Sequence, residues 1–132
     1  MDESLLQREM NVLFTAFLPS ELAERFSYLL SLKPARWGKI EPWEVWKHLR
    51  PPSVTELSES CSGLLASDAF NGHADAPATV LRCGHDRPAL NKMVLRDALI
   101  GPATVFEGFI SVVPGRLGLA INHDGGLCIL RK

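Results

Sequence analysis

The stretch FISVVPGRLGLAINHDGGLCILRK, residues 109–132, most constrains what this chain can fold into. It contains three short runs of apolar and β-branched residues, separated by the turn sequences PG and DGG. Proline sets the first central position of a tight turn, and glycine supplies the second. The pattern therefore predicts a β-meander, with strands over residues 105–113, 116–123 and 127–132.

Side-chain alternation assigns the faces of this predicted sheet, since successive residues of a strand point to opposite sides. The middle strand has one apolar face, made by Leu117, Leu119 and Ile121. The last strand places Leu127, Ile129 and Arg131 on one face, with Cys128 and Leu130 on the other. Apolar residues on both faces indicate that at least part of the sheet is covered on both sides.

Helical periodicity dominates the front of the chain. Apolar side chains recur at helical spacing over residues 3–17 and again from Ser20 to about Lys33. Ser20 is expected to cap the second helix, because its hydroxyl can accept a hydrogen bond from a free backbone N–H. Pro34 ends that helix, since proline disfavours helical geometry in the residue before it.

Two more helices are expected before residue 67. Pro42, at a first helical position, starts a short third helix that ends at Pro51. Ser53 and Glu56 form a capping box ahead of an apolar stripe, which predicts a fourth helix over residues 53–66.

The rest of the chain mixes strand and helix signals. Residues 67–77 are rich in turn formers and read as a loop. Residues 78–83 read as a strand, and a second loop covers 84–91. Residues 92–100 are predicted to be a helix that turns Val94, Leu95, Ala98 and Leu99 inward.

These patterns predict an α+β fold in which an N-terminal layer of about four helices packs on a small antiparallel sheet with a C-terminal β-meander. The length of 132 residues suits a single domain over 1–132, with a helical part at 1–66 and a mixed part at 78–132.

Composition and charge exclude several classes of protein. The net charge is −1, so the chain lacks the basic character that nucleic-acid binding needs. No apolar run approaches the roughly 20 residues of a membrane span. Met1 is followed by Asp2 and Glu3, whose charge is wrong for a signal peptide, so we expect a cytoplasmic location.

Cys61, Cys83 and Cys128 are an odd number of widely spaced cysteines, which does not fit a disulfide framework. We expect three free thiols, no bound zinc and no cofactor. One alternative site remains. Cys83 and His85 sit at a strand end, His123 sits in a later turn, and Cys128 begins the last strand, so thiols and imidazoles would meet if both loops lie at one edge of the sheet. The spacing matches no metal module, and histidine at the tip of a turn is ordinary.

Three tryptophans, Trp37, Trp43 and Trp46, fall within ten residues. The simplest interpretation is that they wedge the third helix against the first two. The segment is short and broken by prolines, however, so burial of all three indoles is not expected. We expect Trp46 in the core and Trp37 or Trp43 at the surface, as anchors for a partner protein.

The last 55 or so residues resemble a group of small, uncharacterised bacterial proteins. The matching residues are the LRDAL run at Leu95–Leu99, the SVVPGRL hairpin at Ser111–Leu117 and the CIL run at Cys128–Leu130. The group has no established activity, so the resemblance implies a bacterial lineage and a compact α+β fold, and no particular function.

Two function classes remain open. The first is a non-catalytic cytosolic protein that binds a partner protein, as immunity proteins and regulatory subunits do. The second is a small-molecule-binding domain or enzyme that uses the edge with Cys83, His85 and His123. Self-association to a homo-oligomer is a further option, whereas nucleic acid and membrane are not expected partners. The absence of familiar catalytic motifs favours the first class.

Overall fold

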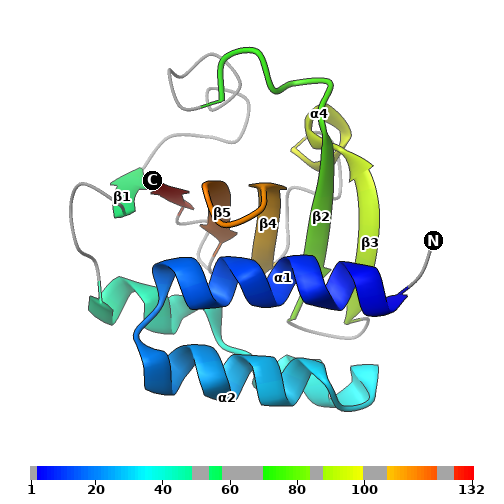
Figure 1. Ribbon diagram of the computed structural model, residues 1–132, viewed down its shortest axis with the longest axis vertical. Helices are drawn as coiled ribbons and strands as arrows, with labels where there is room; N and C mark the ends of the chain where they lie inside the picture. Colours follow the sequence, from blue (N-terminus) through cyan, green and yellow to red (C-terminus); the bar gives the residue numbers. More distant parts are fainter. Residues whose placement is uncertain (1–2, 49–53, 58–69, 84–87, 100–106, 122–126) are drawn as a thin grey trace.

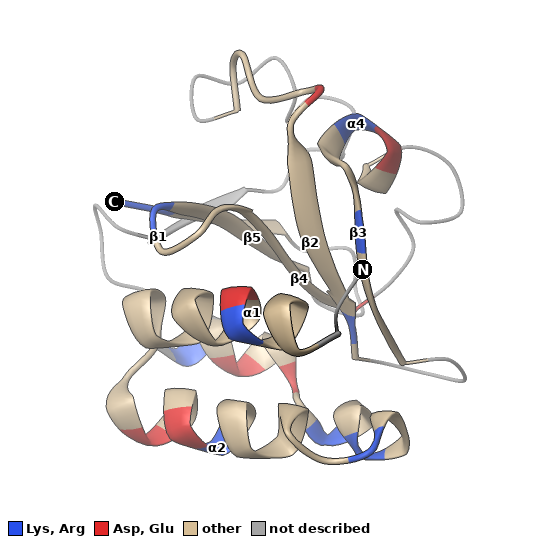
Figure 2. Cartoon of the chain, turned by 45° about the vertical axis from the view of Figure 1, so that its right-hand side comes forward, with Lys and Arg blue, Asp and Glu red and all other residues tan. Residues whose placement is uncertain are grey.

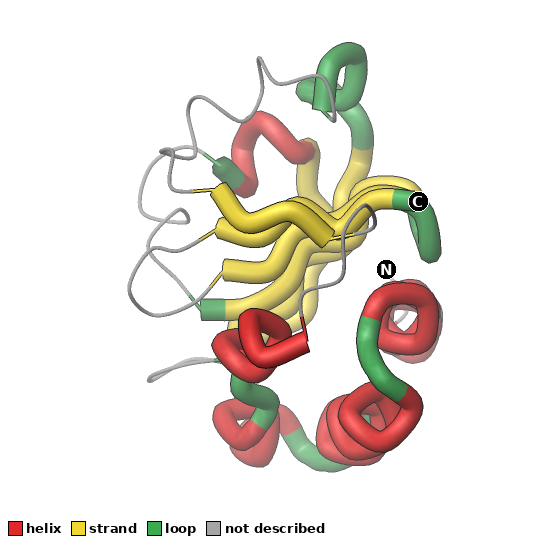
Figure 3. Tube along the Cα trace, turned by 90° about the vertical axis from the view of Figure 1, so that its left-hand side faces the viewer, coloured by secondary structure: helices red, strands yellow, loops and turns green. Residues whose placement is uncertain are grey.

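A layer of helices covers one face of a six-stranded antiparallel sheet, which confirms the expected α+β architecture (Figures 1 and 3). The computed structural model describes residues 3–48, 54–57, 70–83, 88–99, 107–121 and 127–132. Figure 3 shows the longer helices on one side of the sheet and the short helix α4 on the other.

The two predicted N-terminal helices are present as α1, Glu3–Phe17, and α2, Ser20–Leu30. Each turns one apolar stripe toward the sheet, as the helical spacing predicted. The predicted cap is wrong: Pro19 holds the N-cap position of α2, and Ser20 is already helical. The proline side chain has no hydrogen-bond acceptor, so no side-chain cap forms there.

Two 3-10 helices follow, η1 at Pro34–Lys39 and η2 at Pro42–His48. Both begin at a proline, whose fixed φ suits a first helical position. The helix η2 is the predicted third helix, although it is 3-10 and not α. Its predicted end at Pro51 lies outside the described residues.

The C-terminal meander is confirmed as β4, Gly108–Val113, β5, Leu117–Ile121, and β6, Leu127–Arg131. Each strand pairs antiparallel with the next. The Pro–Gly turn forms as expected: the Arg116 N–H donates to the Val113 carbonyl at 2.9 Å, and Gly115 has a φ of 73°. This positive φ is the reason why glycine is needed there. The predicted DGG turn lies outside the described residues.

The sheet continues beyond the meander through β2, Pro77–Arg82, and β3, Ala89–Val94. The strand order is β1-β6-β5-β4-β2-β3. The strand predicted at 78–83 is therefore confirmed to within one residue at each end. The predicted loop at 84–91 is too long, because its last three residues already belong to β3.

The helix predicted at 92–100 is mostly wrong. Residues 92–94 complete β3, which pairs with β2 along its whole length, and the helix α4 covers Leu95–Ala98 alone. Residues 92–94 suit a helix by composition, but pairing with β2 provides the hydrogen bonds that their backbone needs. Leu95, Ala98 and Leu99 are buried as expected, but Val94 is 36% exposed.

The helix predicted at 53–66 is wrong where it can be checked. Residues Val54–Leu57 form β1, an edge strand that pairs with β6 from Val54↔Leu130 to Leu57↔Leu127. Val54 and Thr55 are β-branched and favour a strand, and the neighbouring edge of β6 supplies the hydrogen-bonding partner. The helical part of the chain thus stops before residue 54, while 58–66 lie outside the described residues.

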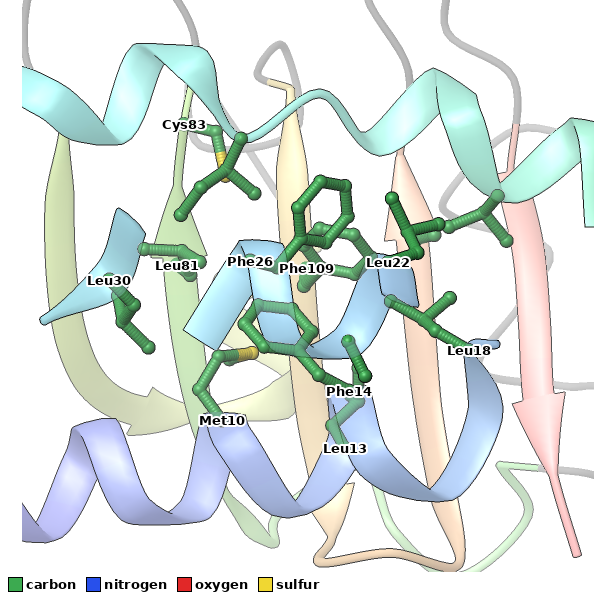
Figure 4. Packing of buried hydrophobic residues seen from close by; sticks show 14 of the residues in the cluster. Met10, Leu13, Phe14, Leu18, Leu22, Phe26, Leu30, Leu81, Cys83 and Phe109 are labelled. Carbon is green, nitrogen blue, oxygen red and sulfur yellow. The ribbon is translucent and has the colours of Figure 1, made fainter. Parts of the chain in front are cut away.

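Apolar side chains fill both sides of the sheet, as the alternation predicted. Between the sheet and the helical layer, Phe14 lies 5.5 Å from Phe26 and 5.2 Å from Phe109, measured between ring centroids (Figure 4). Both contacts are edge-on, the arrangement that aromatic rings prefer. On the opposite face, side chains of β4, β5 and β6 pack with Phe70 and with α4.

The helix α1 runs across the strands (Figure 1), and its Leu13 side chain lies against Gly118 of β5. At Gly118 of β5, an added Cβ would lie 2.6 Å from Cδ1 of Leu13. Glycine therefore lets α1 approach the sheet.

Candidate functional site

The two cysteines of the predicted Cys/His edge do not come together. Cys128 of β6 is in register with Ala120, Phe109 and Leu81 on successive strands, and Cys83 follows Leu81 by two residues. Cys83 and Cys128 therefore lie on the same face but three strand spacings apart, about 14 Å. One metal ion, whose bonds to sulfur are about 2.3 Å long, does not bridge that distance.

The histidines of that site, His85 and His123, lie outside the described residues. The strands β2 and β5 run in the same direction and finish at the same end of the sheet, because Arg82 and Ile121 are both in register with Gly108. Within the described part of the chain, no three His, Cys, Asp or Glu side chains lie close enough together to hold a metal ion.

The environment of Cys83 makes it a poor nucleophile or ligand. Its side chain is fully buried in the core under the helical layer (Figure 4). Burial raises the pKa of the Cys83 thiol well above its ordinary value, and the negative charge of Glu107 raises it further. Since the thiolate is the reactive form, the thiol is held in its inert state.

We expect Cys83 and Cys128 to resist alkylation by iodoacetamide in the folded protein at neutral pH, because both thiols are buried. In denaturant without reductant, all three cysteines should react, as free thiols do. Mass spectrometry of the digested protein gives the result for each cysteine. An adduct on Cys83 in the folded protein would contradict this prediction.

The expectation that Trp37 is exposed is wrong. Its side chain is 1% exposed, and its Nε1 donates to the carbonyl oxygens of Leu30 at 3.1 Å and Leu32 at 3.2 Å. These carbonyls lie at the C-terminal end of α2, where helix carbonyls lack partners within the helix. Trp37 thus both fills the core and satisfies the end of α2, so it is not a docking residue.

Trp43 is at the surface, as expected, with 36% of its area exposed. The Lys47 ammonium lies 4.1 Å from the centroid of its ring, which is a cation–π contact. The side chains of Trp46 and His48 lie outside the described residues, so the core position predicted for Trp46 stays a prediction.

A polar cluster that the sequence did not reveal joins α1 to the sheet. Lys92 of β3 donates to Oε2 of Glu9 at 2.8 Å and contacts Oγ1 of Thr79 at 3.2 Å, while the Thr79 hydroxyl also donates to Glu9. A hydroxyl beside a lysine is an arrangement that nucleophilic enzymes use. Thr79 is completely buried under α1, however, so no substrate reaches it. The cluster fixes α1 on β2 and β3.

This cluster should make stability depend on pH in the acid range. Partial burial raises the pKa of Glu9, but the hydrogen bonds from Lys92 and Thr79 and the charge of Lys92 outweigh it and hold the pKa below its ordinary value. A depressed pKa means that the stabilisation is present above the unfolded-state pKa of about 4.3 and is lost as the pH falls through the folded-state value.

We therefore expect Glu9→Gln to cost about 1 kcal/mol at pH 7 and less at a pH below the folded-state pKa of Glu9, where the wild-type carboxyl is also neutral. Urea denaturation at both pH values measures the difference. Glu21→Gln, an exposed carboxylate on α2, is the matched control and should have little effect at either pH. An equal cost of Glu9→Gln at both pH values would show that the charge is not the cause.

A basic hollow lies where η1 follows α2, and Figure 2 shows the Lys and Arg segments gathered there. It has a volume of about 410 Å³ and is lined by Tyr28, Leu29, Leu32, Lys33, Arg36 and Lys39. We call this surface the basic hollow. Tyr28 is 64% exposed, and none of the six lining residues is acidic. The hollow thus offers aromatic and aliphatic surface beside uncompensated positive charge.

The sequence carries a signal for this surface, but its period is neither that of an α-helix nor that of a strand. Lys33, Arg36 and Lys39 recur every three residues, and Trp37 and Ile40 share the same spacing. A 3-10 helix has three residues per turn, so residues spaced by three lie on the same side of it. The exposed cations and the buried residues Trp37 and Ile40 therefore lie on different sides of this segment.

Comparison with protein-family models, with curated proteins and with solved structures finds no match to this chain. Of the described helices, none is long and apolar enough to cross a membrane.

Proposed function

We propose that this chain is a non-catalytic bacterial cytosolic protein that binds a partner protein, in the manner of an immunity protein or a regulatory subunit. The observation that supports the proposal is the basic hollow, in which an exposed tyrosine stands beside half-buried leucines and three cations. Tyrosine, tryptophan and arginine are the residues that most often anchor protein interfaces.

Trp43 adds a second exposed aromatic residue to the same helical layer. It lies in η2, which is tied to α2 by the ion pair between Glu44 and Arg25. The aromatic residues Tyr28 and Trp43 therefore belong to two elements that flank one another. Exposed aromatic side chains on packed elements bind at low cost in conformational entropy.

The alternative of an enzyme at the Cys/His edge has less support. Cys83 is buried with a raised pKa, and Cys128 is three strands away. Neither thiol lines the basic hollow.

A photo-crosslinking amino acid at position 28 or 43, in the cells of origin, tests the proposal directly. We expect one reproducible protein adduct at these positions. Position 94 is the control, because Val94 is 36% exposed, as Trp43 is, but lies on the edge strand β3. Equal labelling from position 94, or none from 28 and 43, would contradict the proposal.

With the partner in hand, Trp43→Ala and Tyr28→Ser should each weaken binding about tenfold or more, since truncated anchors commonly cost this much. Their free energies of unfolding should stay within about 1 kcal/mol of the wild type, because both side chains are exposed. Calorimetric titration and urea denaturation measure the two effects separately. A variant that loses stability but keeps its affinity would show that its side chain stabilises the fold and does not contribute to binding.

A further inference from the structure

The cations of the basic hollow, Lys33, Arg36 and Lys39, recur every three residues along the chain. The 3-10 geometry of η1 is fixed by i→i+3 bonds: the Arg36 N–H donates to the Lys33 carbonyl at 2.8 Å, and the Ile40 N–H donates to the Trp37 carbonyl at 3.0 Å. Residues three apart in such a helix are aligned and about 6 Å apart along its axis. Arg36 and Lys39 are therefore in line on an exposed side of η1, away from the buried Trp37, and Lys33 precedes them at the N-cap position; we call these three cations the row.

The charge of this row is not neutralised within the described part of the chain. The described ion pairs join Arg25 to Glu44, Lys92 to Glu9 and Arg96 to Asp75, and none includes a residue of the row. All three side chains of the row are exposed. The row is also rigidly supported, because Trp37 and Ile40 anchor the same helix in the core.

We infer that the row binds an acidic, extended segment of the partner protein, with Tyr28 and the hollow taking an apolar or aromatic side chain of that segment. This inference rests on the proposed function and specifies the chemistry of the partner. Alternate side chains of an extended strand are about 7 Å apart on one face, close to the roughly 6 Å that separates Arg36 from Lys39 along η1. Glutamates or aspartates at alternate positions would therefore meet successive cations.

The size of the hollow favours side chains of an extended segment over a docked helix. At about 410 Å³ it is within the range of sites that take small groups, whereas a helix with its side chains is about 10 Å across. The overall charge of −1 argues against nucleic acid, which is bound by broadly basic surfaces.

The test uses a labelled peptide in which glutamate alternates with valine and one tyrosine, and fluorescence anisotropy with the full-length protein. We expect binding that weakens as salt rises, because exposed charges are screened. The same peptide with glutamine in place of glutamate should bind at least about tenfold more weakly. Lys33→Glu, Arg36→Glu and Lys39→Glu together should have a similar effect on the glutamate peptide.

The matched control reverses three other exposed cations, Arg8, Arg116 and Arg131, and so changes the net charge by the same amount. This variant should bind the glutamate peptide within about twofold of the wild type, since screening confines charge effects to near neighbours. Equal weakening in both triple variants would overturn the inference, because net charge and not the row would then be the cause. Tighter binding of an oligothymidylate of equal length would overturn it in favour of nucleic acid.

The inference and the proposed function fail separately. If position 28 crosslinks to a partner protein but the captured segment has no acidic residues, the proposed function stands and the inference fails. If the glutamate peptide binds through the row but no protein is crosslinked in cells, the chemistry of the row stands and the proposed function fails.

Discussion

Phe14→Ala is expected to lower the free energy of unfolding by about 3–5 kcal/mol, the usual cost of deleting a buried phenylalanine ring. Phe14 has no exposed area and makes edge-on contacts with both Phe26 of α2 and Phe109 of β4. Removing the ring therefore opens a cavity where α1, α2 and the sheet meet. A shift in the midpoint of guanidinium denaturation at unchanged slope measures the loss.

Leu5→Ala on the same helix is the control, because Leu5 is 44% exposed. We expect it to change stability by about 0.5 kcal/mol or less, as exposed positions usually do. If Phe14→Ala costs no more than Leu5→Ala, the packing of α1 against α2 and the sheet described above is incorrect.

The long, strongly patterned elements could be predicted from the sequence. The apolar stripes of α1 and α2 repeat over several turns, so the probability that this helical spacing arose by chance is small. The meander was predictable because proline and glycine impose the turn at residues 114–115, and alternation then decides which side chains face each side. These signals are local, because each of them depends only on the residues of its own segment.

The elements that were mispredicted depend on contacts distant in sequence. The run at 92–94 suits a helix by composition, but it becomes strand because β2 offers it a pairing edge. The capping-box pattern at Ser53 and Glu56 is equally local, and pairing with β6 overrides it at Val54–Leu57. Short segments are the ones in which such tertiary pairing outweighs propensity.

The candidate site was predicted less well than the fold, for a similar reason. Trp37 is buried because two carbonyls at the end of α2 accept its N–H, and those acceptors cannot be read from composition. The exposure of Trp43 was predicted correctly. The basic hollow was not predicted, because its three cations are spaced by three residues, which is the period of neither an α-helix nor a strand. Only the structure shows that these three cations line one hollow.

Gly118→Val is expected to destabilise the protein by about 2–3 kcal/mol, although valine is a far better strand former than glycine. A Cβ at position 118 would lie 2.6 Å from Cδ1 of Leu13 and 2.7 Å from the carbonyl oxygen of Ile110. The leucine side chain can rotate, but the Ile110 oxygen belongs to the backbone of the paired strand β4 and cannot move alone. Relief therefore requires α1 or β4 to shift, which disturbs the core on that face of the sheet.

Gly38→Ala is the control for this prediction, because an added Cβ there would meet its nearest neighbour, the Cys83 carbonyl oxygen, at an ordinary 3.4 Å. Its effect on stability should be about 0.5 kcal/mol or less. Gly118→Ala should fall between the two, since it adds the clashing Cβ without the two further methyl groups of valine. Thermal and urea denaturation of the three variants give this order directly. If Gly118→Val were as stable as the wild type, α1 would not lie as close to β5 as described, and strand propensity would decide the outcome.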